Sequence, residues 1–254
     1  MKKNKASAGM IISKIVKIVV VLIFAVVGFY GVKGYIMFKN SVKEVSISEL
    51  TDEIFTQEDF VSYNELPEIY INAVISVEDK RFYTHHGIDV FATGRAVLTD
   101  LKTMSFAEGG STITQQVAKN LLFTQEKKIE RKFAEVFAAF ELEEKFSKKQ
   151  IFELYVNTIY FGNGYYGIYE ASHGYFGKEP YELTNYEAVM LAGLPNAPSD
   201  YSPGSSMKLA EKRMKVVLKR MVKCKKITED EADEIFESKS QDLLMKLSSL
   251  DSAA

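Results

Sequence analysis

The sequence predicts a mainly α-helical protein in which one membrane-spanning helix precedes a single domain. Three S/T-x-x-E/Q capping boxes, at 147–150, 184–187 and 228–231, each precede apolar residues at helical spacing. Strand signals are sparse, and the best short candidate is the stretch from Val45 to Leu50. With 254 residues and 46% hydrophobic content, the chain is long enough to bury one core, in one lobe or two.

The N-terminal segment is typical of a membrane anchor. Residues 1–43 contain eight lysines and no acidic residue, and fifteen uncharged residues lie between Lys17 and Lys33. A span of about 20 residues is reached if these two lysines extend their side chains to the membrane surface. The sequence therefore predicts a basic cytoplasmic tail at 1–17 and a span at 18–38, with the rest of the chain outside. A cleaved signal peptide is the alternative, but no convincing small-x-small cleavage site follows the apolar run.

The charge of the remaining chain argues against one class of partner. Eight of the 32 Lys and Arg residues lie in residues 1–43, which leaves 24 against 34 acidic residues. An acidic domain disfavours binding to nucleic acid. The single cysteine, Cys224, excludes a disulfide within the chain.

The helices after the anchor can be placed in order. Residues 39–65 resemble a linker, and Pro67 then suits the first turn of a helix that ends near Val77. Further helices are expected at 129–146 and from Met207 to about Cys224. We assign the domain to 66–240 and a C-terminal tail to 241–254. The apolar residues that indicate these helices are Ile69, Ala73, Val74 and Val77, then Phe133, Val136, Phe137 and Phe140, and finally Met214, Val217, Leu218 and Met221.

The first polar block, residues 78–87, places a carboxylate at the end of the helix that follows Pro67. The negative pole of the helix dipole opposes the ionised form of Glu78, and such placements occur at sites that need a proton acceptor or donor. The alternative is a solvated acidic loop in which Phe82 enters the core. The chain contains only one histidine besides His85 and His86, namely His173, which argues against a His-rich zinc site.

The second block, residues 109–120, combines two glycines with hydroxyl, amide and ammonium groups. Glycines let backbone N–H groups approach an anion, and a helix start capped by Ser or Thr presents unpaired donors. The block therefore suits a phosphate, a sugar or both, although the spacing excludes a nucleotide P-loop. A polar helix start at the surface is the alternative.

Two further blocks follow. Arg131 and Glu135 share a helix face, and the small apolar residues on that side suggest a partly buried pair facing a cleft, with a surface pair as the alternative. Residues 153–157, Glu-Leu-Tyr-Val-Asn, precede a glycine and aromatic loop at 160–167 that suits a sugar or, by default, a sharp chain reversal. Two carboxylates with Lys, Arg and amide donors indicate glycosyl transfer from a phosphorylated donor, because a diphosphate leaving group needs cations.

Four ordered motifs carry a family resemblance. They are Glu-Asp-x-x-Phe-x-x-His-x-Gly at 78–87, Gly-Gly-Ser-Thr-x-Thr-Gln-Gln-x-x-Lys-Asn at 109–120, Arg-Lys-x-x-Glu at 131–135 and Glu-x-Tyr-x-Asn at 153–157. Over about residues 60–237 the chain resembles the peptidoglycan glycosyltransferases, the transglycosylase domains of class A penicillin-binding proteins and their monofunctional relatives. Nothing after residue 240 is long enough for a transpeptidase, so the resemblance is to the monofunctional branch.

The resemblance implies a fold and a reaction. The fold would be a lysozyme-like large lobe with a small membrane-proximal lobe, and the substrate would be lipid II. Glu78 would be the general base that deprotonates the acceptor's 4-hydroxyl, and Glu135 would assist departure of the diphosphate or order the cations. The residues expected to bind the donor are Ser111, Thr112, Gln116, Lys119, Asn120, Arg131 and Lys132. Those expected to support the site are Asp79, Phe82, His85, Glu153, Tyr155 and Asn157.

The resemblance also sets expectations about location and partners. The protein would be a single-pass protein of the bacterial cell membrane whose partners are lipid II, the growing glycan strand and the membrane, with cell-wall synthesis or division proteins as further candidates. No organic cofactor is expected, and a requirement for Mg²⁺ or Mn²⁺ is left open. Apolar residues at 88–106 and 121–123 would enter the membrane interface or pack in the core. A lysozyme-like hydrolase or lytic enzyme, and a catalytically silent anchored scaffold, remain the alternative functions.

Overall fold

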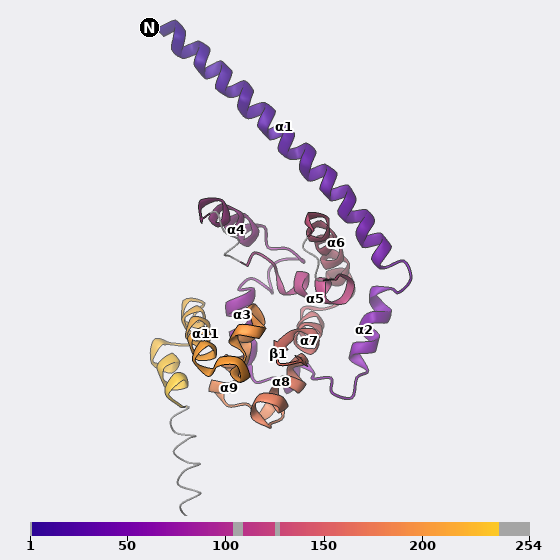
Figure 1. Cartoon of the computed structure of the whole chain (residues 1–254), viewed down its shortest axis with the longest axis vertical. Coiled ribbons are helices and arrows are strands. Elements are labelled where there is room, and N and C mark those ends of the chain that lie inside the picture. The colour runs from indigo at the N-terminus through magenta and orange to yellow at the C-terminus, as the bar shows by residue number, and fades with distance from the viewer. Residues whose placement is uncertain (1, 104–108, 125–127, 239–254) are drawn as a thin grey trace, which may run out of the picture.

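The computed structural model describes residues 2–103, 109–124 and 128–238 (Figure 1). A long N-terminal helix, α1 (Lys2–Ser41), leads into a helical body. The predicted mainly α-helical architecture is confirmed. The body contains α2 (Ile47–Phe55), α3 (Glu68–Glu78), α4 (Val90–Thr103), α5 (Ile113–Leu122), α6 (Ile129–Lys145), α7 (Lys148–Thr158), α8 (Gly167–Phe176), α9 (Asn185–Gly193), α10 (Pro198–Tyr201) and α11 (Pro203–Lys223). Short 3₁₀ turns lie at Tyr63–Glu65, Pro180–Glu182 and Leu194–Asn196, and residues 229–238 are helical.

The core lies where these helices cross. Helices α3, α9 and α11 pack on one another, and α5 packs on both α6 and α7. Large side chains fill the space between them, including the fully buried Tyr70, Phe82, Phe152, Tyr155 and Met190. The predicted capping boxes at Ser147 and Thr184 form at the starts of α7 and α9. The regular part of α11 begins after Ser206, where the backbone is non-helical, so the prediction of a helix from Met207 is confirmed.

Two expectations about the segment before α3 are wrong. Residues Val45 to Leu50 do not form a strand, because Ser46 and Glu49 make a reciprocal capping box that starts α2. Residues 39–65 are not an extended linker either, since Ile47, Ile54 and Val61 belong to the hydrophobic core. The helical spacing of Ile47, Thr51 and Ile54 buries one face of α2.

The glycine and aromatic loop at 160–167 forms a chain reversal. Strands β1 (Tyr160–Gly162) and β2 (Tyr165–Tyr166) pair antiparallel, and this hairpin is the only sheet within the described residues. Gly162, Asn163 and Gly164 all have positive φ, which glycine and asparagine tolerate in a tight turn. The default interpretation of this loop is therefore correct.

Helix α1 projects away from the body and meets it only near its C-terminal end (Figure 1). Its stretch from Ser13 to Ser41 is long and apolar enough to cross a membrane. The aromatic residues of α6 contact this helix, since Phe133 stacks with Tyr30 and Phe137 lies edge-on to Tyr35. Small residues of α6, including Ala134 and Ala138, face the core instead.

Helix α4 lies on the side of the body toward which α1 projects (Figure 1). Val90, Phe91 and Leu98 are exposed, so these residues do not pack in the core. Ile88 is half-buried, and Leu121, Leu122 and Phe123 pack partly against the core. The side chains of Leu101, Met104 and Phe106, and the tail at 241–254, lie outside the described residues.

Candidate active site

A cavity of about 470 Å³ opens between the end of α3, the following loop, α5, α6 and α11. It brings together residues of the first three polar blocks. Its basic lining residues outnumber its acidic ones: Lys80, Arg95, Lys119, Arg131, Lys132, Arg213 and Arg220 accompany Glu78, Asp79, Asp89 and Glu135. Such a cavity suits an anionic ligand and still holds carboxylates for acid–base chemistry.

Glu78 is the last residue of α3, at the position that the sequence predicts for the helix end. Its side chain is 12% exposed, and its Oε2 accepts a hydrogen bond of 2.8 Å from Nε2 of Gln116. Nη2 of Arg213 lies 3.9 Å from Oε1. Burial raises the pKa of Glu78, and the Gln116 hydrogen bond and the charges of Arg213 and Lys119 only partly oppose that rise. Glu78 is thus a carboxylate that can accept a proton.

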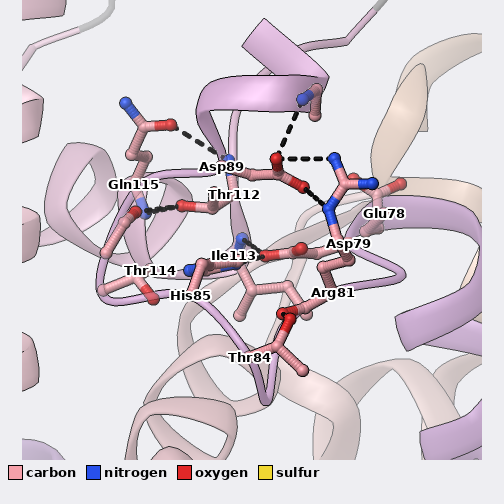
Figure 2. Close-up of polar contacts among 12 residues, drawn as sticks. Glu78, Asp79, Arg81, Thr84, His85, Asp89, Thr112, Ile113, Thr114 and Gln115 are labelled. Carbon is pink, nitrogen blue, oxygen red and sulfur yellow. Dashed lines mark hydrogen bonds and ion pairs between the residues drawn. The ribbon is translucent and has the colours of Figure 1, made fainter.

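The loop after Glu78 is tied to the start of α5 (Figure 2). Oδ2 of the buried Asp79 accepts a hydrogen bond of 3.1 Å from the backbone N–H of Ile113, and Nε2 of His85 lies 2.8 Å from the same oxygen. Thr112 Oγ1 donates to the carbonyl of Gly87 at 2.6 Å. These contacts fix the position of Glu78 relative to Gln116, which lies on α5.

A second contact fixes the other end of this loop (Figure 2). Arg81 donates through Nε and Nη2 to the two oxygens of Asp89, at 2.8 and 2.6 Å, and the backbone N–H of Ala92 donates to Asp89 at 2.8 Å. This bidentate pair gives a defined geometry at the start of α4. Phe82 is fully buried and packs against Phe152, so the loop is anchored in the core as well.

The expected residues of the 109–120 block separate into two groups. Ser111, Gln116 and Lys119 line the cavity, where Ser111 is hydrogen-bonded to Lys132 and Gln116 to Glu78. Thr112 also lines it, but its hydroxyl caps α5 by accepting from the N–H of Gln115 and is bound to Gly87. Asn120 does not line the cavity.

Glu135 lies at the centre of a group of cations. It is 1% exposed; Arg131 Nε lies 3.1 Å from its Oε1, and Lys132 Nζ lies 2.7 Å from its Oε2. Lys132 also donates to Ser111 Oγ at 2.6 Å. Burial lowers the pKa of Lys119, with Arg131 and Lys132 adding repulsion while Glu135 opposes it.

This group, which we call the cation cluster (Lys119, Arg131, Lys132 and Glu135), is suited to bind an anion. Among the described residues, the side-chain ammonium of Lys119 has no hydrogen-bond or ion-pair partner. The contact between Arg131 Nε and Glu135 Oε1 lacks hydrogen-bond geometry, so both atoms retain hydrogen-bonding capacity. Three cations surround a single carboxylate, and the excess positive charge faces the cavity.

Residues 153–157, which were expected to support the site, hold the segment before α3 through Glu153 and Asn157. Glu153 Oε1 accepts from the N–H of Tyr63 at 2.8 Å, and the Asn157 side chain both accepts from and donates to the backbone of Val61 at 2.9 Å. Neither residue lines the cavity. The hydroxyl of the buried Tyr155 has no hydrogen-bond partner among the described residues, and burial raises its pKa.

Helix α11 contributes side chains to the cavity that the sequence motifs do not predict. Arg213 lies beside Glu78, its Nε donates to the carbonyl of Gly193 at 3.1 Å, and Arg220 lines the same cavity. Arg213 is four residues before the buried Val217, so a charge at a core-facing position was the available signal. Lys80, Arg95 and Asn196 also line the cavity and were not identified.

No group of three His, Cys, Asp or Glu residues within the described segments could hold a metal ion. The cavity combines one carboxylate of raised pKa, Glu78, with the cation cluster. Lys119 connects them electrostatically, because both Glu135 and Glu78 act on its pKa.

Comparisons with known proteins identify the family to which the chain belongs. The family model described as transglycosylase matches residues 43–222. Penicillin-binding protein 1F of Bacillus subtilis is 53% identical over 143 residues, which are 56% of this chain and 20% of that protein. Penicillin-binding protein 1A of Aquifex aeolicus is 45% identical over 175 residues, 69% of this chain and 24% of that protein.

The chain therefore spans about a fifth to a quarter of the length of these curated relatives. A crystal structure of penicillin-binding protein 1A from Haemophilus influenzae is 33% identical and covers 49% of this chain and 16% of that one, with a TM-score of 0.34. The family match begins at residue 43, within the segment that the sequence analysis took for a linker, and it includes every residue that lines the cavity. On the extent of this match, the chain belongs to the transglycosylase family.

Proposed function

We propose that the protein is a peptidoglycan glycosyltransferase that polymerises lipid II into linear glycan strands. The observation that carries this proposal is that Glu78, with its raised pKa, and the cation cluster line one cavity. A base and an anion site in one cavity match the needs of glycosyl transfer from a diphosphate-linked donor. Membership of the transglycosylase family supports the same reaction class.

In the proposed reaction, Glu78 accepts the proton of the acceptor's 4-hydroxyl. The freed oxygen forms a bond to C1 of the donor sugar, while the bond between C1 and the diphosphate oxygen breaks. Attack from the face opposite the leaving group inverts C1 and gives a β-1,4 link. Gln116 orients the Glu78 carboxylate through its 2.8 Å hydrogen bond.

The cation cluster stabilises the charge that develops on the departing polyprenyl diphosphate. Lys119, Arg131 and Lys132 supply the positive charge, and Glu135 orders Arg131 and Lys132 by contacting both. Cations fixed in advance stabilise a leaving group without reorganisation during the reaction. Ser111 completes the arrangement by accepting a hydrogen bond from Lys132.

The same geometry disfavours the two alternatives. A hydrolase of uncharged glycosidic bonds has no need for the cation cluster around Glu135. A catalytically silent scaffold would have no need to keep Glu78 and Glu135 in one cavity. We further propose that α1 holds the protein in the bacterial membrane with its N-terminus in the cytoplasm. The proposed partners are lipid II, the growing strand and other cell-wall synthesis or division proteins.

The test is polymerisation by the full chain in lipid vesicles supplied with lipid II. We expect glycan polymer from the native protein, assayed in parallel with Mg²⁺, with Mn²⁺ and with a chelator to settle the metal requirement. Absence of polymer under all three conditions would overturn the proposal. Release of short sugars from finished glycan, without polymer, would instead identify the hydrolase.

A further inference from the structure

The membrane anchor and α6 are packed unusually closely. One face of α1 is turned to α6, with Tyr30 half-buried and Gly34 and Phe38 buried. A Cβ on Gly34 would overlap that of Phe133 and would lie 2.9 Å from the backbone nitrogen of Ala134 and 3.0 Å from the backbone oxygen of Glu130. Two of these three atoms are backbone, so only a glycine permits this approach.

The other glycines of α1 are not constrained in this way. A Cβ on Gly28 or Gly31 would meet nothing within 4 Å. The requirement for glycine is thus specific to the position where α1 crosses α6. Around it, Lys33 Nζ forms an ion pair of 3.2 Å with Glu130, and Tyr30 stacks on Phe133 at 6.5 Å between ring centroids.

The same turns of α6 carry three of the four members of the cation cluster. Glu130, Phe133 and the backbone of Ala134 lie against α1, whereas Arg131, Lys132 and Glu135 line the cavity. The two sets alternate along the first turns of the helix, so a displacement of the backbone at Phe133 or Ala134 moves the cavity side chains as well. Within the described segments, α6 packs more extensively on α1 than on any other helix, so the contact with α1 is one of the main constraints on this end of α6.

We propose that Gly34 is a positioning residue, through which the membrane anchor sets the place of Arg131, Lys132 and Glu135. This inference rests on the proposed function, in which these side chains bind the diphosphate of a membrane-bound substrate. A helix that crosses the membrane fixes the depth of α6 relative to the lipid surface. The cations are then held at the depth where a lipid-linked diphosphate presents itself, and the anchor acts as part of the framework of the site rather than as a tether alone.

The test compares alanine substitutions at matched glycines of α1, each made in the full chain in lipid vesicles. Gly34→Ala forces α1 and α6 apart, whereas Gly31→Ala and Gly28→Ala gain the same helix propensity without a contact. We expect Gly34→Ala to lower kcat/KM for lipid II polymerisation about tenfold or more, mainly through kcat, because misplaced cations stabilise the leaving group less well. The two control variants are expected to stay within about twofold of the native protein.

Binding of a polyprenyl diphosphate provides a second readout that does not depend on turnover. Its Kd is expected to rise in Gly34→Ala and to stay unchanged in Gly31→Ala. If Gly34→Ala fails to fold, Tyr30→Ala removes the ring that stacks on Phe133, and Val32→Ala, at an exposed position, is its control. A smaller loss of diphosphate binding, about threefold, is then expected for Tyr30→Ala alone.

The outcomes separate this proposal from the proposed function. If the native protein makes no polymer, the proposed function fails. If the native protein makes polymer and Gly34→Ala matches Gly31→Ala in kcat, KM and diphosphate affinity, the positioning role of Gly34 is overturned while the function stands. Equal losses in all three glycine variants would also overturn it, because the effect would then belong to the anchor as a whole.

Discussion

Glu78 and Glu135 are two carboxylates that line the same cavity and differ in their partners. Glu78 accepts one hydrogen bond from a neutral amide at 2.8 Å, and its nearest cation, Arg213, is 3.9 Å away. Glu135 has two cations at 2.7 and 3.1 Å, and Lys119 acts on it from the same cavity. Both side chains are largely buried, with exposures of 12% for Glu78 and 2% for Glu135. Their charged and polar partners therefore account for the difference between the two environments.

This difference assigns opposite tasks to chemically similar groups. A buried carboxylate whose charge is poorly compensated is driven toward the protonated form, which gives Glu78 the affinity for a proton that a base requires. A carboxylate enclosed by cations instead orders those cations and limits their mutual repulsion. The comparison therefore predicts that neutralising each carboxylate changes activity and stability in different ways.

The largest expected effect on activity comes from Glu78→Gln. The amide keeps the shape of the side chain and can still accept from Gln116, but it cannot take the acceptor's proton. We expect kcat to fall by about 10³-fold, within the range for loss of a general base, with lipid II binding retained. The measurement is single-turnover polymerisation together with a binding assay.

The same variant is expected to be more stable than the native protein at neutral pH. The pKa of Glu78 is raised in the folded state, so the folded state binds more protons than the unfolded state between the two pKa values, and stability falls as pH rises through that window. Above the folded pKa the full cost of the buried charge is present, and Gln removes it. Thermal unfolding should therefore show a higher Tm for Glu78→Gln, and native-like turnover in that variant would exclude Glu78 as the base.

Glu135→Gln is expected to have a smaller effect on activity and the opposite effect on stability. Without its charge, Arg131 and Lys132 repel each other and Lys119 without compensation. Breaking a buried ion pair from one side costs about 3 kcal/mol or more, so Tm should fall. We expect kcat/KM to fall about 10- to 100-fold, because the cations remain but are less well ordered. A loss equal to that of Glu78→Gln, with unchanged Tm, would contradict the assignment of roles.

The local placement of both carboxylates could be predicted from the sequence. Pro67 and the apolar spacing after it set the bounds of α3 and so placed Glu78 at a helix end. The spacing of Arg131 and Glu135 fixed their common face, and the adjacent small residues correctly indicated a buried pair. Both conclusions depend on contacts within one helix, which local sequence determines.

Features that depend on tertiary contacts were not predictable in the same way. The proximity of Arg213 to Glu78 requires α11 to pack beside the end of α3, and nothing in either segment alone specifies that crossing. The aromatic stripe of α6 was recognised, but its partner, α1, was treated as a separate anchor. The error at 45–50 is different, because the capping box of Ser46 and Glu49 was present in the sequence and was overlooked.

The smallest expected effect is a shift in the pH dependence of activity. It tests which contacts limit the rise in the pKa of Glu78. Activity requires the ionised carboxylate, so kcat/KM should fall as pH decreases through the raised pKa of Glu78. The guanidinium of Arg213 favours ionisation, and Arg213→Gln should therefore move this acidic limb to higher pH. Gln116→Leu should move it further, because the Gln116 hydrogen bond lowers the pKa more than Arg213 does.

Arg220→Gln is the matched control, since Arg220 lines the cavity but is not among the groups that act on Glu78. If Arg220→Gln moves the limb as far as Arg213→Gln, the total positive charge of the cavity sets the basicity of Glu78, and the individual contacts that distinguish it from Glu135 do not.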